Sequence, residues 1–272
     1  MAPSLSPRKL FQWYLEAGVD ETIGDEPVNR YMAGETPAAS RRQGSGDFPP
    51  AAVASARKPA NGRRPDTPDT ALRSACALAA EAATVSELHE ALSAFDGCAL
   101  KKTATNLVFG DGNPEARIVF IGEAPGAEED RQGRPFVGPS GRLLDRMLAS
   151  IELDRTKVFI SNTVFWRPPG NRNPTTTEMT ICTPFVERLL ELIDPHILVP
   201  LGGAAAKTLL AQNESIGKLR GRWFTYSTPR LPRPVHAAAI FHPAYLLRTP
   251  AKKREAWRDL LEIKRKLISL QE

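Results

Sequence analysis

The sequence predicts an α/β protein in which a central four-stranded parallel sheet lies between two layers of helices. Four short apolar runs have the length of buried strands: Arg117–Ile121, Lys157–Asn162, Ile197–Leu201 and Val235–Phe241. Helical patterns separate these runs along the chain, and such strand–helix alternation is typical of a parallel sheet. Right-handed crossovers place helices on both faces, so we expect a three-layer α/β/α sandwich.

Capping residues and apolar spacing predict where the helices lie. One helix begins at Pro68, and the next begins at the capping box Thr84-x-x-Glu87, after which Leu88, Leu92 and Phe95 recur on one face. Between the strands, the same kind of spacing predicts helices over Ser140–Ile151, Thr177–Ile193 and Ala204–Ala211. A last helix, Lys252–Leu270, is expected to turn Trp257, Leu260, Leu261 and Leu267 inward.

Composition divides the chain into three regions. Residues 1–32 contain the apolar stretch Leu10–Leu15, which predicts a short N-terminal helical segment. Residues 33–67 are rich in Pro, Gly, Ser, Ala and Arg and have few large hydrophobic side chains, so we expect a disordered basic linker. Residues 68–272 carry all the strand patterns and form the predicted folded domain.

Charge and cysteine content narrow the class of protein. The formal net charge of +5 hints at a polyanionic partner without establishing one. No apolar run is long enough to span a membrane, and the first residues lack a hydrophobic signal core, so we expect a cytoplasmic monomer without membrane contact. The cysteines Cys76, Cys98 and Cys182 lie far apart, which argues against a disulfide framework.

Unusual residues follow each predicted strand. Gly122–Gly126 follow the first run, Asn162 ends the second, Gly202 and Gly203 follow the third, and His242 follows the fourth. Because the carboxyl ends of parallel strands meet at one edge of a sheet, where ligands bind in such folds, we expect these residues to share a site.

The segment 121–141 combines carboxylates, an aromatic ring and glycines. Glu123, Glu129 and Asp130 can handle water or a developing positive charge, and Phe136 offers a flat face. The segment lacks the glycine patterns of a dinucleotide fingerprint or a phosphate-binding P-loop, which disfavours nucleoside triphosphate chemistry. A tight strand-to-helix connection without any ligand is the alternative explanation for these residues.

Asn162 and His242 are the other candidates for chemistry. The carboxamide of Asn162 can offer a donor and an acceptor to a flat ligand edge, or it can cap the next turn. A lone histidine is usually satisfied by local hydrogen bonds, but His242 shares the predicted strand-end edge with the carboxylates. Both residues are therefore candidate ligand contacts.

Two segments near this edge suit a nucleic acid. The run from Tyr245 to Arg248 places apolar side chains beside a cation, a combination that can wedge into a base stack while the guanidinium holds phosphate. The segment from Arg167 to Arg172 is a rigid basic loop. A core helix turn and a solvated surface loop are the respective alternatives.

Four motifs in this order carry a family resemblance. They are Gly-Glu-Ala-Pro-Gly-x-x-Glu-Asp, Gly-Arg-Pro-Phe-Val-Gly, Arg-Pro-Pro-Gly-Asn-Arg and His-Pro-Ala-Tyr-Leu-Leu. Together they resemble the family 4 uracil-DNA glycosylases over about residues 95–270. The resemblance implies that residues 68–272 form a DNA-repair enzyme domain that extrudes uracil from DNA and hydrolyses its N-glycosidic bond, leaving free uracil and an abasic site.

The resemblance also implies roles at the base. Phe136 would stack on the extruded uracil, Asn162 would read its Watson–Crick edge, and His242 would hydrogen-bond O2 as negative charge builds on the leaving base. The amides around Gly122, Ala124 and Gly126 would support the carbonyls. Glu129, with Asp130 or Glu123, would orient water and stabilise the oxocarbenium-like sugar.

For the DNA strand, the resemblance implies that Leu246 or Leu247 fills the vacated stack. Ser140, Arg167 and Arg248 would hold phosphates. The nearest enzyme alternative prefers another deaminated base, and a different class of protein would bind damaged or abasic DNA without catalysis. Tight binding without release of free base would distinguish that last class.

The chain departs from the resemblance at the cysteines. Members of the family typically hold an iron–sulfur cluster with four cysteines, but the corresponding positions here read Phe95, Cys98, Trp166 and Cys182. A four-thiolate site cannot be built from the cysteines of this chain, so we expect no cluster, no metal and no other cofactor. We expect Phe95 and Trp166 to fill the volume instead, with a two-cysteine metal site as the alternative.

Overall fold

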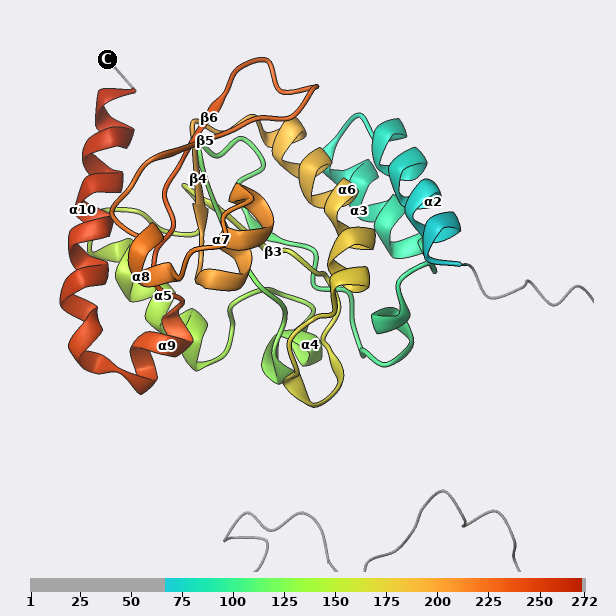
Figure 1. Cartoon of the computed structure of the whole chain (residues 1–272), viewed down its shortest axis with the longest axis horizontal. Coiled ribbons are helices and arrows are strands. Elements are labelled where there is room, and N and C mark those ends of the chain that lie inside the picture. Colours follow the sequence, from blue (N-terminus) through green and yellow to red (C-terminus); the bar gives the residue numbers. More distant parts are fainter. Residues whose placement is uncertain (1–66, 271–272) are drawn as a thin grey trace, which may run out of the picture. The chain divides into compact units, whose positions relative to one another are not determined.

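The computed structural model describes residues 67–270 (Figure 1). The chain divides into two units, Met1–Pro59 and Ala60–Glu272, and all the described residues belong to the second. The helical segment predicted for residues 1–32 and the linker predicted for 33–67 lie, apart from Thr67, outside the described residues. No helix within residues 67–270 has both the length and the apolar character needed to cross a membrane.

The sheet has six strands in the order β1-β3-β2-β4-β6-β5. The central four are parallel and correspond to the predicted runs: β3 (Phe159–Asn162), β2 (Ile118–Gly122), β4 (Ile197–Pro200) and β6 (Val235–Ala237). Antiparallel edge strands flank them, β1 (Asp111–Gly112) and β5 (Phe224–Tyr226). The predicted four-stranded sheet was therefore incomplete, because short strands at an exposed edge need no apolar run.

One layer of helices covers one face of the sheet. It contains α2 (Pro68–Glu81), α3 (Val85–Ala94), α6 (Thr176–Ile193) and α7 (Gly203–Leu210). The larger apolar core lies here, and it includes Leu88 and Leu92 of α3 with Phe185 and Leu189 of α6. The predicted capping box at Thr84 is half formed: the Thr84 hydroxyl accepts from the Glu87 amide at 3.1 Å, but the Glu87 carboxylate accepts from the amide of Ala83 instead of that of Thr84.

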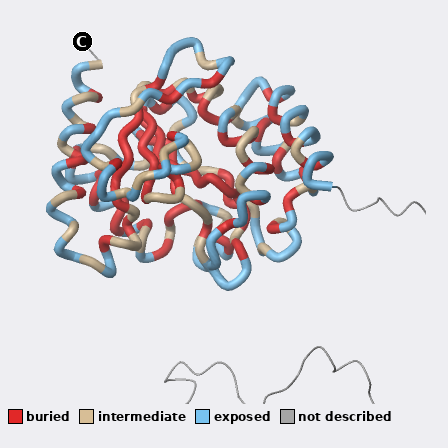
Figure 2. Tube along the Cα trace, viewed as in Figure 1, coloured by how far each residue is buried: buried red, intermediate tan, exposed pale blue. Residues whose placement is uncertain are grey.

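The other face is covered by α5 (Pro139–Ala149), α9 (Pro243–Arg248) and α10 (Lys253–Ser269), as Figure 1 shows. A second apolar core lies between these helices and the sheet, and buried residues run along the central strands (Figure 2). Leu260 and Leu267 of α10 are buried, as predicted. The inward prediction for Trp257 was wrong, because this side chain is 41% exposed.

Short elements complete the fold. The helix α4 (Ala127–Gln132) follows β2, α8 (Ile216–Leu219) follows α7, and single 3₁₀ turns lie at Ala99–Lys102, Pro169–Asn171 and Pro250–Lys252. The last predicted strand is shorter than expected: after Ala237 only Ile240 still pairs, through an isolated bridge with Leu201. The chain then leaves the sheet at His242, which caps α9.

Candidate active site

A cavity of about 370 Å³ opens at the carboxyl ends of the parallel strands. Its wall comes from α4, the N-terminus of α5, the end of β3 and the start of α9. The lining includes seven residues that the sequence singled out: Ala124, Gly126, Glu129, Phe136, Ser140, Asn162 and His242. The parallel register brings them together, since Gly122 of β2 pairs with Asn162 of β3.

Phe136 forms one wall of the cavity. Its ring is buried and lies 5.6 Å from the His242 ring, measured between centroids, while its backbone has a φ of +54°. Non-glycine residues rarely adopt such a φ, so surrounding contacts must hold it. The guanidinium of Arg155 donates to the carbonyls of Pro135 and Phe136 and is itself paired with Asp111.

Two glycines make this arrangement possible. A Cβ on Gly141 would lie 1.6 Å from the carbonyl oxygen of Phe136. Only glycine at position 141 therefore lets α5 approach the Phe136 backbone this closely. A Cβ on Gly122 would lie 2.4 Å from the Asn162 Oδ1 and 2.7 Å from the Phe136 ring. Gly122 does not line the cavity, and the structure instead places it where it makes room for two side chains that do.

Asn162 lies almost completely buried in the cavity wall, with 1% of its surface exposed. Its Oδ1 has no hydrogen-bond partner in the described part of the chain. A buried, unpaired amide oxygen costs free energy, and the great majority of such atoms in native proteins are paired. The position and this missing partner leave the carboxamide oxygen available to a ligand in the cavity.

His242 faces the same cavity from the N-cap of α9. Its Nδ1 accepts a hydrogen bond from the Ala244 amide at 3.1 Å, which assigns the neutral ring its proton on Nε2. Burial, together with the smaller effect of the Arg248 charge, lowers the pKa of His242 to about 4, and the Glu129 charge opposes this shift. The imidazole is therefore a neutral hydrogen-bond donor at physiological pH.

Glu129 holds the loop that surrounds the cavity. Its Oε1 accepts from the amides of Val137 and Gly138, both at 2.9 Å, and its Oε2 accepts from the amide of Gly126 at 3.2 Å. Because Glu129 also lines the cavity, its negative charge is fixed at the site by backbone hydrogen bonds.

The structure does not bring Asp130 into this cavity. The side chain is buried, and its Oδ1 accepts from the amides of Thr105 and Asn106 at 2.8 and 3.1 Å. Neighbouring helix positions point in different directions, so Asp130 anchors an adjacent loop while Glu129 faces the cavity.

A second cavity of about 500 Å³ adjoins the first and shares Ala124, Gly126, His242 and Ala244 with it. Glu123 and Arg248 line this second cavity, and burial raises the pKa of the Glu123 carboxyl, which has no hydrogen-bond partner within residues 67–270. Arg167 lines neither cavity, because its Nε donates to the Asn171 Oδ1 at 2.8 Å.

The two candidate wedge residues of α9 differ in exposure. Leu246 is 1% exposed and packs in the core, whereas Leu247 is 41% exposed. A side chain that enters a base stack must be free to leave its own surface, so Leu247 is the available one.

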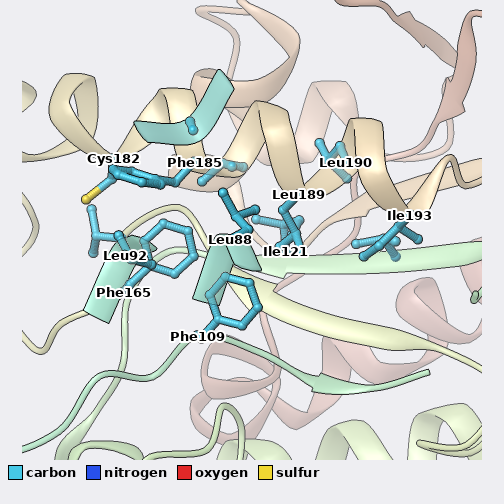
Figure 3. Close-up of a cluster of buried hydrophobic side chains, with 14 of the residues drawn as sticks. Leu88, Leu92, Phe109, Ile121, Phe165, Cys182, Phe185, Leu189, Leu190 and Ile193 are labelled. Atoms are coloured by element: carbon cyan, nitrogen blue, oxygen red, sulfur yellow. The ribbon is translucent and has the colours of Figure 1, made fainter. Parts of the chain in front are cut away.

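The cysteine positions form a packed interior. Cys98 and Cys182 are buried beside each other, and the hydrogen bond between the two thiols lowers the pKa of Cys98 and raises that of Cys182. Phe95 and Trp166 are buried in the same core, and Figure 3 shows Cys182 in that cluster with Leu92, Phe165 and Phe185. Two thiols and two aromatic rings do not fit a four-thiolate cluster.

Several of these contacts have no local signal in the sequence. Arg155 and Asp111, which hold the Phe136 backbone, are distant in sequence from that residue and belong to no motif. The remaining cavity walls, Ala127, Glu128, Gly138, Pro139 and Ala244, adjoin the predicted residues in sequence and could have been found as their neighbours.

Comparison with known proteins agrees with this geometry. Residues 109–261 match the model of the uracil DNA glycosylase superfamily. The type-4 uracil-DNA glycosylase of Archaeoglobus fulgidus is 43% identical over 170 residues, which cover 61% of this chain and 84% of the relative. The type-4 enzyme of Saccharolobus solfataricus is 40% identical over 177 residues, which cover 63% of this chain and 81% of the relative. The type-4 enzyme of Thermotoga maritima is 41% identical over 166 residues, which cover 61% of this chain and 83% of the relative. The chain belongs to the uracil-DNA glycosylase superfamily.

Proposed function

We propose that this protein is a DNA-repair uracil-DNA glycosylase, which extrudes uracil from DNA and hydrolyses its N-glycosidic bond. The observation that carries the proposal is the single cavity in which an aromatic ring, an unpaired buried carboxamide and a neutral imidazole meet, those of Phe136, Asn162 and His242. In such a pocket a planar base can stack on the ring, hydrogen-bond to the carboxamide and accept a hydrogen bond from the neutral imidazole.

Uracil would be recognised by its shape and by its edge. The Phe136 ring offers a stacking face, and the Asn162 carboxamide can accept from N3–H while it donates to O4. Backbone groups around Ala124 and Gly126 would support the carbonyls. Cytosine presents the opposite donor and acceptor pattern along this edge, so the same orientation of Asn162 would reject it.

Hydrolysis would proceed by departure of the base. The bond between C1′ and N1 breaks with its electron pair passing to uracil, and Nε2–H of His242 donates to O2, where negative charge builds. The fixed charge of Glu129 stabilises the positive sugar. The partner-free carboxylate of Glu123, whose pKa burial raises, orients the water that adds to C1′ and accepts the proton that this water loses.

The DNA strand would be held around this cavity. Ser140 in the first turn of α5 and Arg248 beside the second cavity are placed to contact phosphates, and Leu247 is placed to enter the vacated stack. Arg167 would act from outside both cavities. Leu246 would support the wedge from the core, and Asp130 would support the loop that carries Glu129.

All the proposed site residues come from one chain, so we expect the monomer to be active. The cytoplasmic location stays a prediction from the sequence. We also propose that the enzyme assembles no iron–sulfur cluster, because packing by Phe95 and Trp166 replaces two of the four thiolates.

The cluster proposal predicts a colourless protein. Purified after expression with added iron, it should show no visible absorbance band, contain far less than one iron per chain, and keep its activity in chelator. Cys98→Ala should leave activity unchanged, since the thiol lines neither cavity. A brown, iron-containing protein that loses its colour in the Cys98→Ala variant would contradict the proposal.

The activity itself is tested with an oligonucleotide that carries one uracil. Wild-type protein in chelator should release free uracil and leave an abasic site that alkali cleaves, while the thymine-containing control stays intact. If the protein binds the strand tightly but the strand stays uncleaved, the enzyme proposal fails and the protein is a non-catalytic binder of damaged DNA. Cleavage of hypoxanthine-containing DNA in preference to uracil would instead support the other-base glycosylase.

A further inference from the structure

A shallow apolar groove of about 260 Å³ lies outside the proposed catalytic site, where α5, α9 and α10 meet (Figure 1). Its apolar walls are Leu143, Met147, Leu246, Trp257 and Leu260. Trp257 in the first turns of α10 is 41% exposed, although the helical pattern predicts it inside. A partly exposed indole in the lining of a groove is a surface on which a planar aromatic group can stack.

The charges around this groove suit phosphate. Arg146 and Lys253 line it, and no carboxylate does. Arg254 and Arg258 flank Trp257 on the same helix and are exposed. Within residues 67–270 none of these four cations forms a salt bridge, so all of them are available to a polyanion.

The groove and the proposed catalytic cavity draw their linings from the same two helices, α5 and α9. On α5, Pro139 and Ser140 line the catalytic cavity, and Leu143 and Met147 line the groove. On α9, Ala244 lines the cavity and Leu246 the groove. With a helical rise of about 1.5 Å per residue, the step along α5 is roughly 5–10 Å, so a strand held at the catalytic cavity can also reach the groove.

We propose that Trp257 stacks on an unpaired base of the substrate strand, a few nucleotides from the extruded uracil, while Arg146 and Lys253 hold the adjacent phosphates. This inference rests on the proposed function and names its substrate class, single-stranded DNA. An aromatic face among cations is the usual platform for single strands, whereas duplex DNA hides its base faces and would engage only the cations. Trp257 therefore favours uracil in unpaired regions.

The test compares Trp257→Ala with a matched change at another exposed indole. Trp223 is 39% exposed and contacts the His236 ring at the β5 side of the sheet, so Trp223→Ala removes an equal side chain away from the groove. Dissociation constants would be measured by fluorescence anisotropy with a single-stranded uracil oligonucleotide of about 20 nucleotides and with the duplex of the same length.

Trp257→Ala should weaken binding of the single strand about tenfold, as expected for one lost stacking contact. Binding of the duplex should change less than twofold. Trp257→Phe should restore most of the affinity, and Trp223→Ala should bind like wild type. Equal affinities of Trp257→Ala and Trp223→Ala for the single strand, or an equal loss on the duplex, would overturn the proposal.

Uracil release by the wild-type protein, measured on the same oligonucleotides, separates this inference from the proposed function. If no uracil is released, the enzyme assignment fails, while the anisotropy measurement still decides whether Trp257 binds single strands. If uracil is released but Trp257→Ala binds normally, only the stacking inference fails.

Discussion

Replacing Asn162 with alanine should lower kcat/KM for uracil excision by about 10³-fold, which corresponds to about 4 kcal/mol. The carboxamide can form two hydrogen bonds with uracil in a buried wall, and truncation would leave the base's N3–H and O4 without partners there. Single-turnover release of uracil from the oligonucleotide would measure the loss.

The same substitution should leave stability nearly unchanged. Because Oδ1 of Asn162 has no partner in the described structure, its removal breaks no hydrogen bond that the fold needs. Ser161→Ala is the matched control: the neighbouring Ser161 is also buried, and its hydroxyl donates to the Phe109 carbonyl. We expect that control to lower Tm by a few degrees while uracil release continues. An Asn162→Ala protein that excises uracil normally would remove the recognition role.

Sequence reasoning anticipated which residues meet at one cavity because the motifs coincide with strand ends. Gly122, Asn162 and His242 each follow an apolar run, and parallel pairing is enough to bring such positions to one edge. The same reasoning could not orient individual side chains within a motif. Glu129 and Asp130 are adjacent, yet one faces the cavity and the other an outer loop, and only the helix phase of α4 decides between them.

Other features depend on contacts between distant residues. The positive φ of Phe136 is held by Arg155 and by the close approach of Gly141, and neither contact follows from a local pattern. Trp257 shows the opposite error: helical periodicity assigns a large apolar residue to the core, but it cannot tell a core face from an exposed groove. The edge strands β1 and β5 were not predicted, because neither contains an apolar run of strand length.

His242→Ala should lower kcat by about 10²–10³-fold with little change in KM, corresponding to about 3–4 kcal/mol of lost transition-state stabilisation. The imidazole would contribute mainly when charge builds on O2, so its loss should affect the chemical step more than substrate binding. His242→Gln, which keeps a neutral N–H donor, should recover part of the rate. His236→Ala changes a histidine outside the cavity and should behave like wild type.

The pH dependence provides an independent test of the same residue. Because burial lowers the pKa of His242 from its ordinary value of 6.5 to about 4, the ring should stay neutral, and its donor role unchanged, as the pH falls from 8 to about 5. An unfolded chain binds this proton near pH 6.5, so stability should decline as the pH falls from there towards 4. His242→Ala should lose that part of the decline. An NMR titration of the His242 ring near pH 6.5 would show instead that a charged imidazolium serves the leaving base.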